Sequence, residues 1–262
     1  MLNSMLNIKS ILKLLSSMAV IFSIGACGQP SYEVTHIDAR HIEVKPSTPS
    51  SSEMDDYLLP MVDSMSAVMD RVISYSPQYA DKYEGRLGAW LADVSIEEVE
   101  KYMAEKGERV NIDIALFNNG GIRTQMPKGD ITVGWVYEFM PFDNAYVILE
   151  MDNAAMREMF KYLSSAASRG TYHPLGGMRM VYDKNGNWDR TTTIGQWRLT
   201  PGKVYTVLTS DFLHKGGDGM SFFSRATNVR YLPYKMRDGI MNYVTSHDTL
   251  KIPQNHRYHE IQ

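Results

Sequence analysis

Residues 111–123 read Asn-Ile-Asp-Ile-Ala-Leu-Phe-Asn-Asn-Gly-Gly-Ile-Arg. The stretch begins with a short, mostly apolar run of β-forming residues, and the Asn-Asn-Gly-Gly sequence at 118–121 ends that run. Paired glycines after a strand let the backbone turn sharply and approach a ligand, and Arg123 just behind them can bind an anion through two hydrogen bonds. Because Asn-Gly-Gly also forms ordinary turns, the stretch alone is only a weak indication of a binding site.

Around this stretch, the pattern of apolar residues changes between helical and strand periods. We expect a helix over 153–167, strands over 111–117, 178–182 and 203–209, and helix or strand segments over 133–139 and 145–151. No internal repeat interrupts the pattern. The sequence therefore predicts an α/β (α+β) fold, with one domain over residues 54–262 built from a mixed sheet and flanking helices.

Helices are also expected before residue 111. Leu58, Val62, Met65 and Met69 are spaced by three and four residues, which predicts a helix with one buried face. The methionines of this segment favour adaptable core packing over binding of a soft metal. Two further helices are expected over 83–94 and 95–106, the second starting at a Ser-x-x-Glu capping box (95–98).

The first residues have the features of a secretory signal. Basic residues lead into an apolar stretch over 14–24, which is too short to span a bilayer as a stable helix. The stretch ends in Ile-Gly-Ala-Cys (24–27), which resembles the bacterial lipobox; the alternative is an ordinary signal peptide with an incidental cysteine. Cys27 is the only cysteine of the chain, which favours lipidation at that residue. We predict a lipoprotein signal peptide over 1–26.

A tether or linker is expected over 27–53. Its second half is rich in proline, serine and threonine, although residues 32–44 could form a strand or hairpin. Together with the lipid anchor on Cys27, this segment predicts a protein attached to a membrane in the bacterial cell envelope, facing the periplasm or the cell surface. The net charge of -3 provides no field that would attract nucleic acid, so any site for a nucleotide has to be local.

Two more segments combine an aromatic ring with polar groups. In Pro-Phe-Asp-Asn (141–144), Phe142 could stack on a base while Asn144 hydrogen-bonds the base edge or the sugar; the alternative is a packed ring beside a turn. Residues 210–219, Ser-Asp-Phe-Leu-His-Lys-Gly-Gly-Asp-Gly, offer another ring, a glycine pair and a carboxylate. A carboxylate beside a nucleotide accepts hydrogen bonds from hydroxyls or amines, because it repels phosphate.

Taken together, these segments resemble the C-terminal, substrate-recognition domain of the 5'-nucleotidase family, which includes UDP-sugar hydrolases. That domain contains Asn-x-Gly-Gly-[Ile/Val]-Arg, Gly-[Asp]-Ile-Thr, Pro-Phe-x-Asn, and Asp-Phe followed by Gly-Gly-Asp-Gly. The matching segments here occur in the same order, at 118–123, 129–132, 141–144 and 211–219. Residues 87–93 are similar to the Leu-Gly helix of the family, and the resemblance extends over about 55–223.

The resemblance implies a role for each matching residue. The base would lie between the rings of Phe142 and Phe212, a contact worth about 1–3 kcal/mol for each stacked base. Asn144 would hydrogen-bond the base and Asp218 the ribose hydroxyls.

Two further roles follow from the same resemblance. Arg123 would bind the phosphate, and the backbone of Gly177 would lie against the base, although a plain turn is a close alternative for this glycine. Members of the family often carry a pair of arginines upstream of the Leu-Gly helix. The corresponding stretch here, 76–81, has none, which weakens the expected contact with phosphate.

The metal-dependent half of the family has no counterpart in this sequence. In the family, an N-terminal metallophosphatase domain binds two divalent metal ions that activate water. None of the seven histidines lies in a Gly-Asn-His, Gly-His-x-His or Asp-x-His sequence. We therefore expect no catalytic residue, no metal ligand and no cofactor in this chain, with the two divalent metals only on the missing phosphatase domain.

Three hypotheses about function follow. The first is a lipoprotein that binds a nucleotide or nucleoside as the recognition half of a split 5'-nucleotidase, with a separate metallophosphatase subunit as its partner. The second is a stand-alone nucleoside-binding lipoprotein for scavenging. The third is a degenerate structural domain, which the presence of both phenylalanines together with Asn144 and Asp218 argues against.

Overall fold

The computed structural model describes residue 39 and residues 52–262. The expected signal peptide (1–26), the lipidation site Cys27, the possible strand or hairpin over 32–44 and nearly all of the expected tether (27–53) lie outside the described residues. Residues 52–262 form one compact unit. In this part of the chain no helix is both long enough and apolar enough to cross a membrane.

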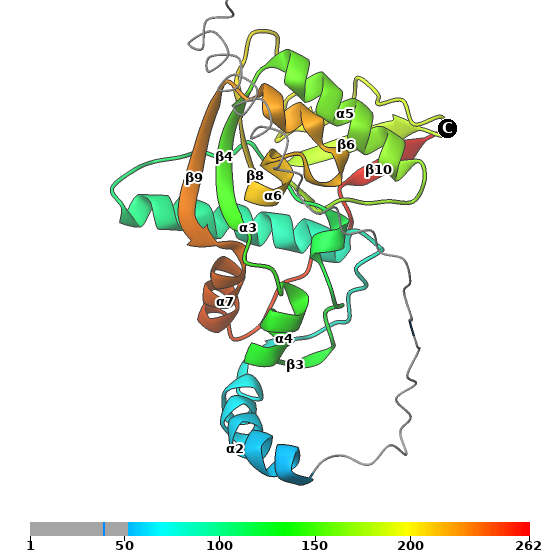
Figure 1. The fold of residues 1–262 in the computed structure, drawn as a ribbon. Coiled ribbons are helices and arrows are strands. Elements are labelled where there is room, and N and C mark those ends of the chain that lie inside the picture. The colour runs from blue at the N-terminus through cyan, green and yellow to red at the C-terminus, as the bar shows by residue number, and fades with distance from the viewer. Residues whose placement is uncertain (1–38, 40–51) are drawn as a thin grey trace, which may run out of the picture. The chain divides into compact units, whose positions relative to one another are not determined.

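A mixed sheet forms the centre of the unit (Figure 1). Its strands are, in spatial order, β5 (Leu175–Gly176), β2 (Ile114–Leu116), β8 (Tyr205–Ser210), β4 (Ala145–Met151) and β9 (Asn228–Lys235). Strands β2 and β8 are parallel, whereas β5, β4 and β9 are antiparallel to their neighbours. The predicted mixed α/β fold is therefore confirmed.

Strand β2 is shorter than the predicted run over 111–117, and Asp113 just before it is joined to Thr206 by both its backbone N–H and its side chain. The carboxylate of Asp113 accepts hydrogen bonds from the backbone N–H of Thr206 at 2.9 Å and from Nζ of Lys203 at 2.7 Å. The residues of β2 that follow are fully buried. The strand thus runs from this polar junction through the core to the Asn-Asn-Gly-Gly turn.

Six α-helices are described, and four of them contact strands of the central sheet: α3 (Arg86–Glu105), α5 (Asn153–Ala167), α6 (Asp211–His214) and α7 (Met236–Ser246). Helix α3 contacts β2, β5 and α7, and helix α5 contacts β4. The bounds of α5 agree with the predicted helix over 153–167. Between α3 and α7 the core is aromatic, because Trp90 packs edge-on against Phe139 and Tyr243 at centroid distances of 5.8 and 6.2 Å.

The predicted division of 83–106 into two helices is wrong. Ser95 lies inside the continuous helix α3, where its Oγ donates to the carbonyl of Leu91 at 2.7 Å. Glu98 is also buried, and it accepts a hydrogen bond from the hydroxyl of Tyr234 at 3.2 Å. The Ser-x-x-Glu spacing is compatible with a capping box at a helix start. Inside a helix, the same spacing places the two side chains on one face. Here that face is the buried one.

The remaining elements form two smaller sheets and several short helices. One sheet pairs β10 (Tyr258–Ile261), β6 (Met178–Asp183) and β7 (Thr193–Ile194), and α5 also contacts β6. The other pairs β1 (Val72–Ser76) with β3 (Gly129–Thr132). The segment over 133–139 is a helix, α4 (Val133–Phe139), capped by the Thr132 side chain, and 145–151 is strand β4.

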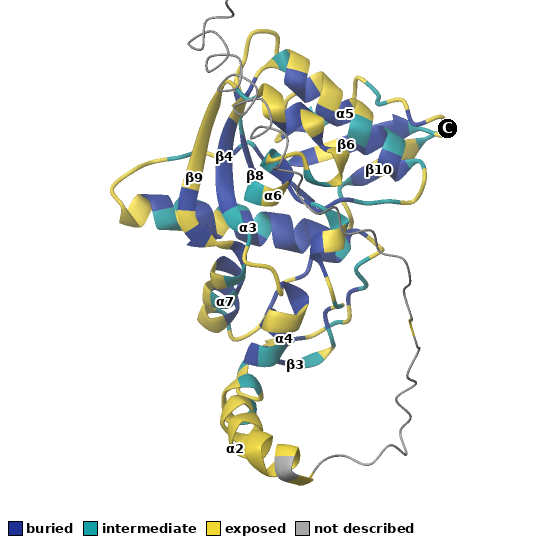
Figure 2. Ribbon diagram, in the orientation of Figure 1, coloured by how far each residue is buried: buried dark blue, intermediate teal, exposed yellow. Residues whose placement is uncertain are grey.

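Helix α2 (Ser52–Met69) confirms the predicted helix but not its buried face. Leu58, Val62 and Met65 are exposed along the helix, and only its last turn meets α4. In Figure 1 the helix extends beyond α4 and β3, and in Figure 2 almost its whole surface is coloured as exposed. The apolar stripe therefore has no partner within the described part of the chain.

Candidate functional site

Three loops meet at one edge of the central sheet and enclose a cleft. The loops follow β2, precede β4 and follow β8. Because β2 and β8 are parallel, their C-terminal ends lie at the same edge, and the antiparallel strand β4 begins there. The cleft has a volume of about 290 Å³ and is lined by Asn118, Gly120, Gly121, Arg123, Phe142, Asn144, Phe212 and Asp218. Five of the six predicted ligand-binding residues are thus brought together.

The loop before β4 is held from its outer side. Asp143 pairs with Lys235 at 2.9 Å and with Arg237, and these hydrogen bonds hold the pKa of its carboxyl below the ordinary value. Arg237 also donates to the carbonyl of Pro141 at 2.9 Å. With Asp143 anchored outward, its neighbours Phe142 and Asn144 face the cleft, and the Phe142 ring is 41% exposed.

The loop after β8 is tied to the start of β4. The carboxylate of Asp211 accepts a hydrogen bond from the backbone N–H of Ala145 at 3.0 Å. The next residue, Phe212, lies in the short helix α6 (Asp211–His214) with its ring 43% exposed. The ring lies against Gly217, where a Cβ atom would come within 2.4 Å of a ring carbon. This glycine is therefore needed for the position that the ring occupies.

Asp218 has a strained backbone that its neighbours stabilise. Its φ of 51° is the only positive value among the non-glycine residues that the structure describes. Its carboxylate accepts from Nδ2 of Asn118 at 2.7 Å, and its carbonyl accepts from the hydroxyl of Tyr162 at 2.9 Å. Strained residues of this kind persist where the surroundings hold them, and they concentrate at functional sites.

Arg123 supplies the positive charge of the cleft. Its guanidinium lies 5.8 Å from the centroid of the Phe142 ring and makes one long hydrogen bond, of 3.4 Å, to the carbonyl of Gly120. Within residues 52–262, no carboxylate lies at ion-pair distance from it. The cleft thus combines two half-exposed rings, two amides, a carboxylate and a guanidinium without an ion-pair partner.

A sequence model of the family described as 5'-nucleotidase, C-terminal domain, matches residues 67–225. The chain belongs to this family. The match covers all three loops of the cleft and confirms the resemblance carried by their motifs. Membership indicates a function related to nucleotides.

Individual relatives agree with this assignment. The chain is 30% identical over 164 residues to cell wall protein Lmo0130 of Listeria monocytogenes, covering 57% of this chain and 20% of that protein. It is 28% identical over 167 residues to the trifunctional nucleotide phosphoesterase protein YfkN of Bacillus subtilis, covering 58% and 10%. A 5'-nucleotidase precursor from Thermus thermophilus shares the fold, with a TM-score of 0.64 and 24% identity over 79% of this chain and 43% of that chain. The chain therefore spans less than half the length of each of these proteins.

His173 is a buried residue that contacts the Asn-Asn-Gly-Gly turn of this 5'-nucleotidase C-terminal domain. This contact was not predicted from the sequence. Nδ1 of His173 accepts a hydrogen bond from the backbone N–H of Asn119 at 3.3 Å. Burial lowers the pKa of His173 to about 4, against the opposing effect of the Asp218 charge. No local motif marks this histidine, and only the long-range contact with the Asn-Asn-Gly-Gly turn identifies it. His214, by contrast, is hydrogen-bonded to the Tyr231 hydroxyl at 2.7 Å and does not line the cleft.

Gly177, predicted to lie against the base, does not line the cleft. Gly177 lies at the opposite end of β2 from the cleft, because β5 pairs antiparallel with β2 and leads away from the turn. At this position φ is 69°, and a Cβ atom would come within 2.2 Å of the carbonyl oxygen of Asp113. Close packing against the neighbouring backbone therefore explains this glycine.

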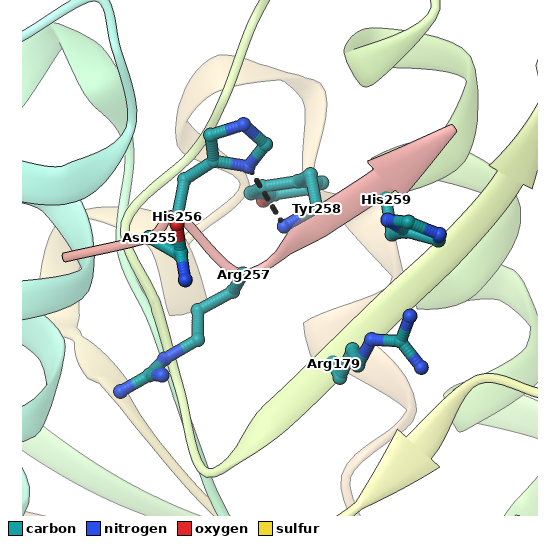
Figure 3. Close-up of a pocket in the computed structure, with 6 residues that line it drawn as sticks. All are labelled: Arg179, Asn255, His256, Arg257, Tyr258 and His259. Carbon is teal, nitrogen blue, oxygen red and sulfur yellow. Dashed lines mark hydrogen bonds between the residues drawn. The ribbon is translucent and has the colours of Figure 1, made fainter. Parts of the chain in front are cut away.

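A larger cavity of about 530 Å³ lies along β10, lined by Arg179, Asn255, His256, Arg257, Tyr258 and His259 (Figure 3). Its basic side chains do not converge, since Arg257 points away from Arg179 and His259. Arg257 is paired with Asp93, and the ring of His256 stacks on Tyr172 at 4.9 Å. Contacts within the protein account for these side chains, and we assign the cavity no ligand.

The described part of the chain holds no group of three or more His, Cys, Asp or Glu side chains arranged to bind a metal ion. The polar side chains of the cleft itself are two amides, a guanidinium and a single carboxylate. This set suits an organic ligand with hydroxyl groups and a negative charge better than a divalent cation, which prefers several carboxylates.

Proposed function

We propose that this protein recognises a nucleotide or nucleoside in the cleft between Phe142 and Phe212. The observation that carries the proposal is that both rings, each about half exposed, line one cleft with polar groups at its border. Exposing two large aromatic rings is unfavourable without a ligand, and a stacked base gains about 1–3 kcal/mol on each ring. Among the residues described, the two rings do not stack on each other, and both line the same cleft.

The polar groups suit the other parts of a nucleotide. Asn144 can donate to and accept from the edge of a base, because its amide offers both functions. Asp218 accepts from ribose hydroxyls, since a carboxylate is an acceptor only. Arg123, which has no carboxylate partner within the described residues, binds the phosphate as a charge-assisted pair.

We further propose that the bound nucleotide is presented to a separate metallophosphatase chain, so that the two chains form a split 5'-nucleotidase. Support comes from the family match, which covers the recognition domain. The competing proposal is a stand-alone nucleoside-binding protein for scavenging. The contribution of the phosphate to affinity distinguishes the two proposals. A recognition subunit binds a nucleotide more tightly than a nucleoside because Arg123 contacts the phosphate, whereas a nucleoside carrier gains nothing from this contact.

The test is a calorimetric titration of residues 28–262 with adenosine, AMP and UMP. This part of the chain keeps every contact described above. The recognition proposal expects AMP to bind more tightly than adenosine. Equal affinities favour the scavenging proposal, and no binding by any of the three contradicts both.

The split enzyme needs its own experiment. Phosphate release from AMP is measured for this chain, for a metallophosphatase chain encoded in the same genome, and for the mixture. The proposal expects the mixture to exceed the sum of the separate rates, because recognition and metal chemistry are then combined. Purely additive rates contradict it.

We also propose that the protein is anchored in the bacterial cell envelope through lipid on Cys27. The lipobox-like sequence before Cys27 supports this, as does the relative named as a cell wall protein. Mass spectrometry of the mature protein from its native host is the test. An N-terminal, acylated Cys27 is expected, and an unmodified Cys27 contradicts the anchor.

A further inference from the structure

Helix α2 carries apolar side chains that nothing in the described part of the chain covers. Tyr57, Leu58, Met61, Met65 and Val68 are all exposed, although a stripe of this kind is normally buried. Figure 2 shows the helix as almost entirely exposed, and Figure 1 shows it reaching beyond α4 and β3. A large exposed apolar strip on a soluble unit marks a surface for association.

The spacing of the strip is that of a coiled coil. Leu58, Met61, Met65 and Val68 follow one another at intervals of three, four and three residues, which are the a and d positions of a heptad. Asp56 and Asp63, seven residues apart, both fall at the f position, opposite this seam. The next residue in that series is Asp70, just past the helix end.

The positions beside the seam carry no charge in the middle of the helix. Tyr57 and Ser64 occupy the g positions, and Val62 and Met69 the e positions. In a two-stranded coiled coil these are the side chains that meet the partner helix, so the only charge beside the seam is that of Asp55, at the e position near the helix start. Pro60 falls at position c, so its ring lies outside the seam, and it removes one backbone hydrogen bond within the helix.

We propose that α2 pairs with the α2 helix of a second copy of this chain to form a two-stranded coiled coil. A membrane is a poorer occupant, because helices that lie on membranes are rich in Lys and Arg, whereas residues 52–69 contain four acidic side chains and no basic one. The pairing uses no residue of the nucleotide cleft, and it stands whether or not the proposed function holds.

The size of the surface predicts a modest affinity. A stable interface takes about 20–30 residues and about 800 Å² from each partner. Helix α2 offers 18 residues. The pairing therefore lies at the lower end of stable interfaces, and the dimer dissociates on dilution. Tethering of both copies to one membrane would raise their effective concentration.

Two substitutions on α2 provide a matched test. Met61 is 51% exposed and lies in the seam at position d, whereas Leu59 is 52% exposed and lies at position b, outside the seam. Met61→Glu and Leu59→Glu therefore introduce the same charge at the same exposure in the monomer. Only Met61→Glu would bury two unpaired carboxylates in a dimer, which weakens association by about 100-fold or more.

The experiment is sedimentation velocity of residues 28–262 over a series of increasing concentrations. Wild type and Leu59→Glu are expected to shift from monomer to dimer, whereas Met61→Glu stays monomeric. Met65→Ser serves as a second seam variant without a charge, expected to weaken the dimer less. A monomeric wild type at all concentrations overturns the proposal, even if it binds vesicles or another protein. Equal behaviour of Met61→Glu and Leu59→Glu overturns it as well.

Discussion

Arg123 is the only basic side chain that lines the cleft, and no carboxylate in residues 52–262 neutralises it. Arg123→Gln should weaken AMP binding roughly 10- to 100-fold, because a hydrogen bond to a charged group contributes about 1.5–3 kcal/mol. Adenosine, which has no phosphate, should bind almost as before. Calorimetry with both ligands measures the difference. An equal loss for AMP and adenosine would show that Arg123 shapes the cleft instead of binding phosphate.

His173 makes the stability of the domain sensitive to acid. Its pKa is about 4 in the folded chain, below the ordinary value of 6.5, because burial disfavours the charged ring. Between pH 6.5 and pH 4 the His173 ring therefore stays neutral in the folded protein, whereas the same ring takes up a proton in the unfolded chain. The free energy of unfolding should fall as the pH falls through this window, by up to about 1.4 kcal/mol per pH unit.

Urea unfolding at several pH values measures this slope, with His173→Gln as the comparison. Glutamine keeps an acceptor for the Asn119 N–H but does not titrate, so the dependence on pH should flatten. If both proteins lose stability in parallel on acidification, other groups cause the effect.

At the scale of elements, the turn η2 (Gly217–Gly219) sets the position of the Phe212 ring. Gly217→Ala should push the ring out of place, because the new methyl group would overlap it. We expect AMP affinity to fall roughly tenfold, in the range that the loss of one stacking contact gives. Ser224→Ala, on the turn η3 (Ser221–Arg225) outside the cleft, is the control and should bind like wild type. Unchanged AMP affinity in Gly217→Ala would show that the position of the Phe212 ring does not contribute to ligand binding.

Helix α5 begins at a side-chain cap. The carboxylate of Asp152 accepts from the backbone N–H groups of Ala154 and Ala155 at 2.9 and 2.8 Å. Asp152→Ala should lower the free energy of unfolding by about 1 kcal/mol, since the first turn loses its acceptor. Chemical denaturation measures the change, with the exposed Lys161→Ala on the same helix as control. Equal stability of the two variants would mean that water replaces the cap without cost.

Elements were predictable where a local signal agrees with tertiary packing. Helix α5 has both an N-cap and an amphipathic face, and its predicted bounds hold. The break expected at Ser95 failed because a Ser-x-x-Glu spacing serves a buried polar network as well as a helix start. Strand β2 is shorter than expected, and Asp113 just before it bonds to Thr206 through its side chain as well as its backbone, a contact that no local pattern indicates.

For the whole molecule, the meeting of Arg123, Phe142, Asn144, Phe212 and Asp218 could be predicted because their motifs occur in a recognisable order. Contacts without a motif could not be predicted. His173 reaches the Asn119 turn only through the fold, and Gly177 is directed away from the cleft by the antiparallel pairing of β5. The exposed stripe of α2 was also unpredictable, because periodicity indicates that a face is covered without indicating by what.

The central claim is that one ligand lies between two aromatic rings, and an AMP titration of ring variants tests it most directly. Phe142→Ala and Phe212→Ala should each weaken binding roughly 5- to 100-fold, as the loss of one stacking contact of about 1–3 kcal/mol requires. Tyr83→Ala removes an exposed ring outside the cleft and should bind like wild type. Wild-type affinity in both phenylalanine variants, or no AMP binding by the intact domain, would contradict the account.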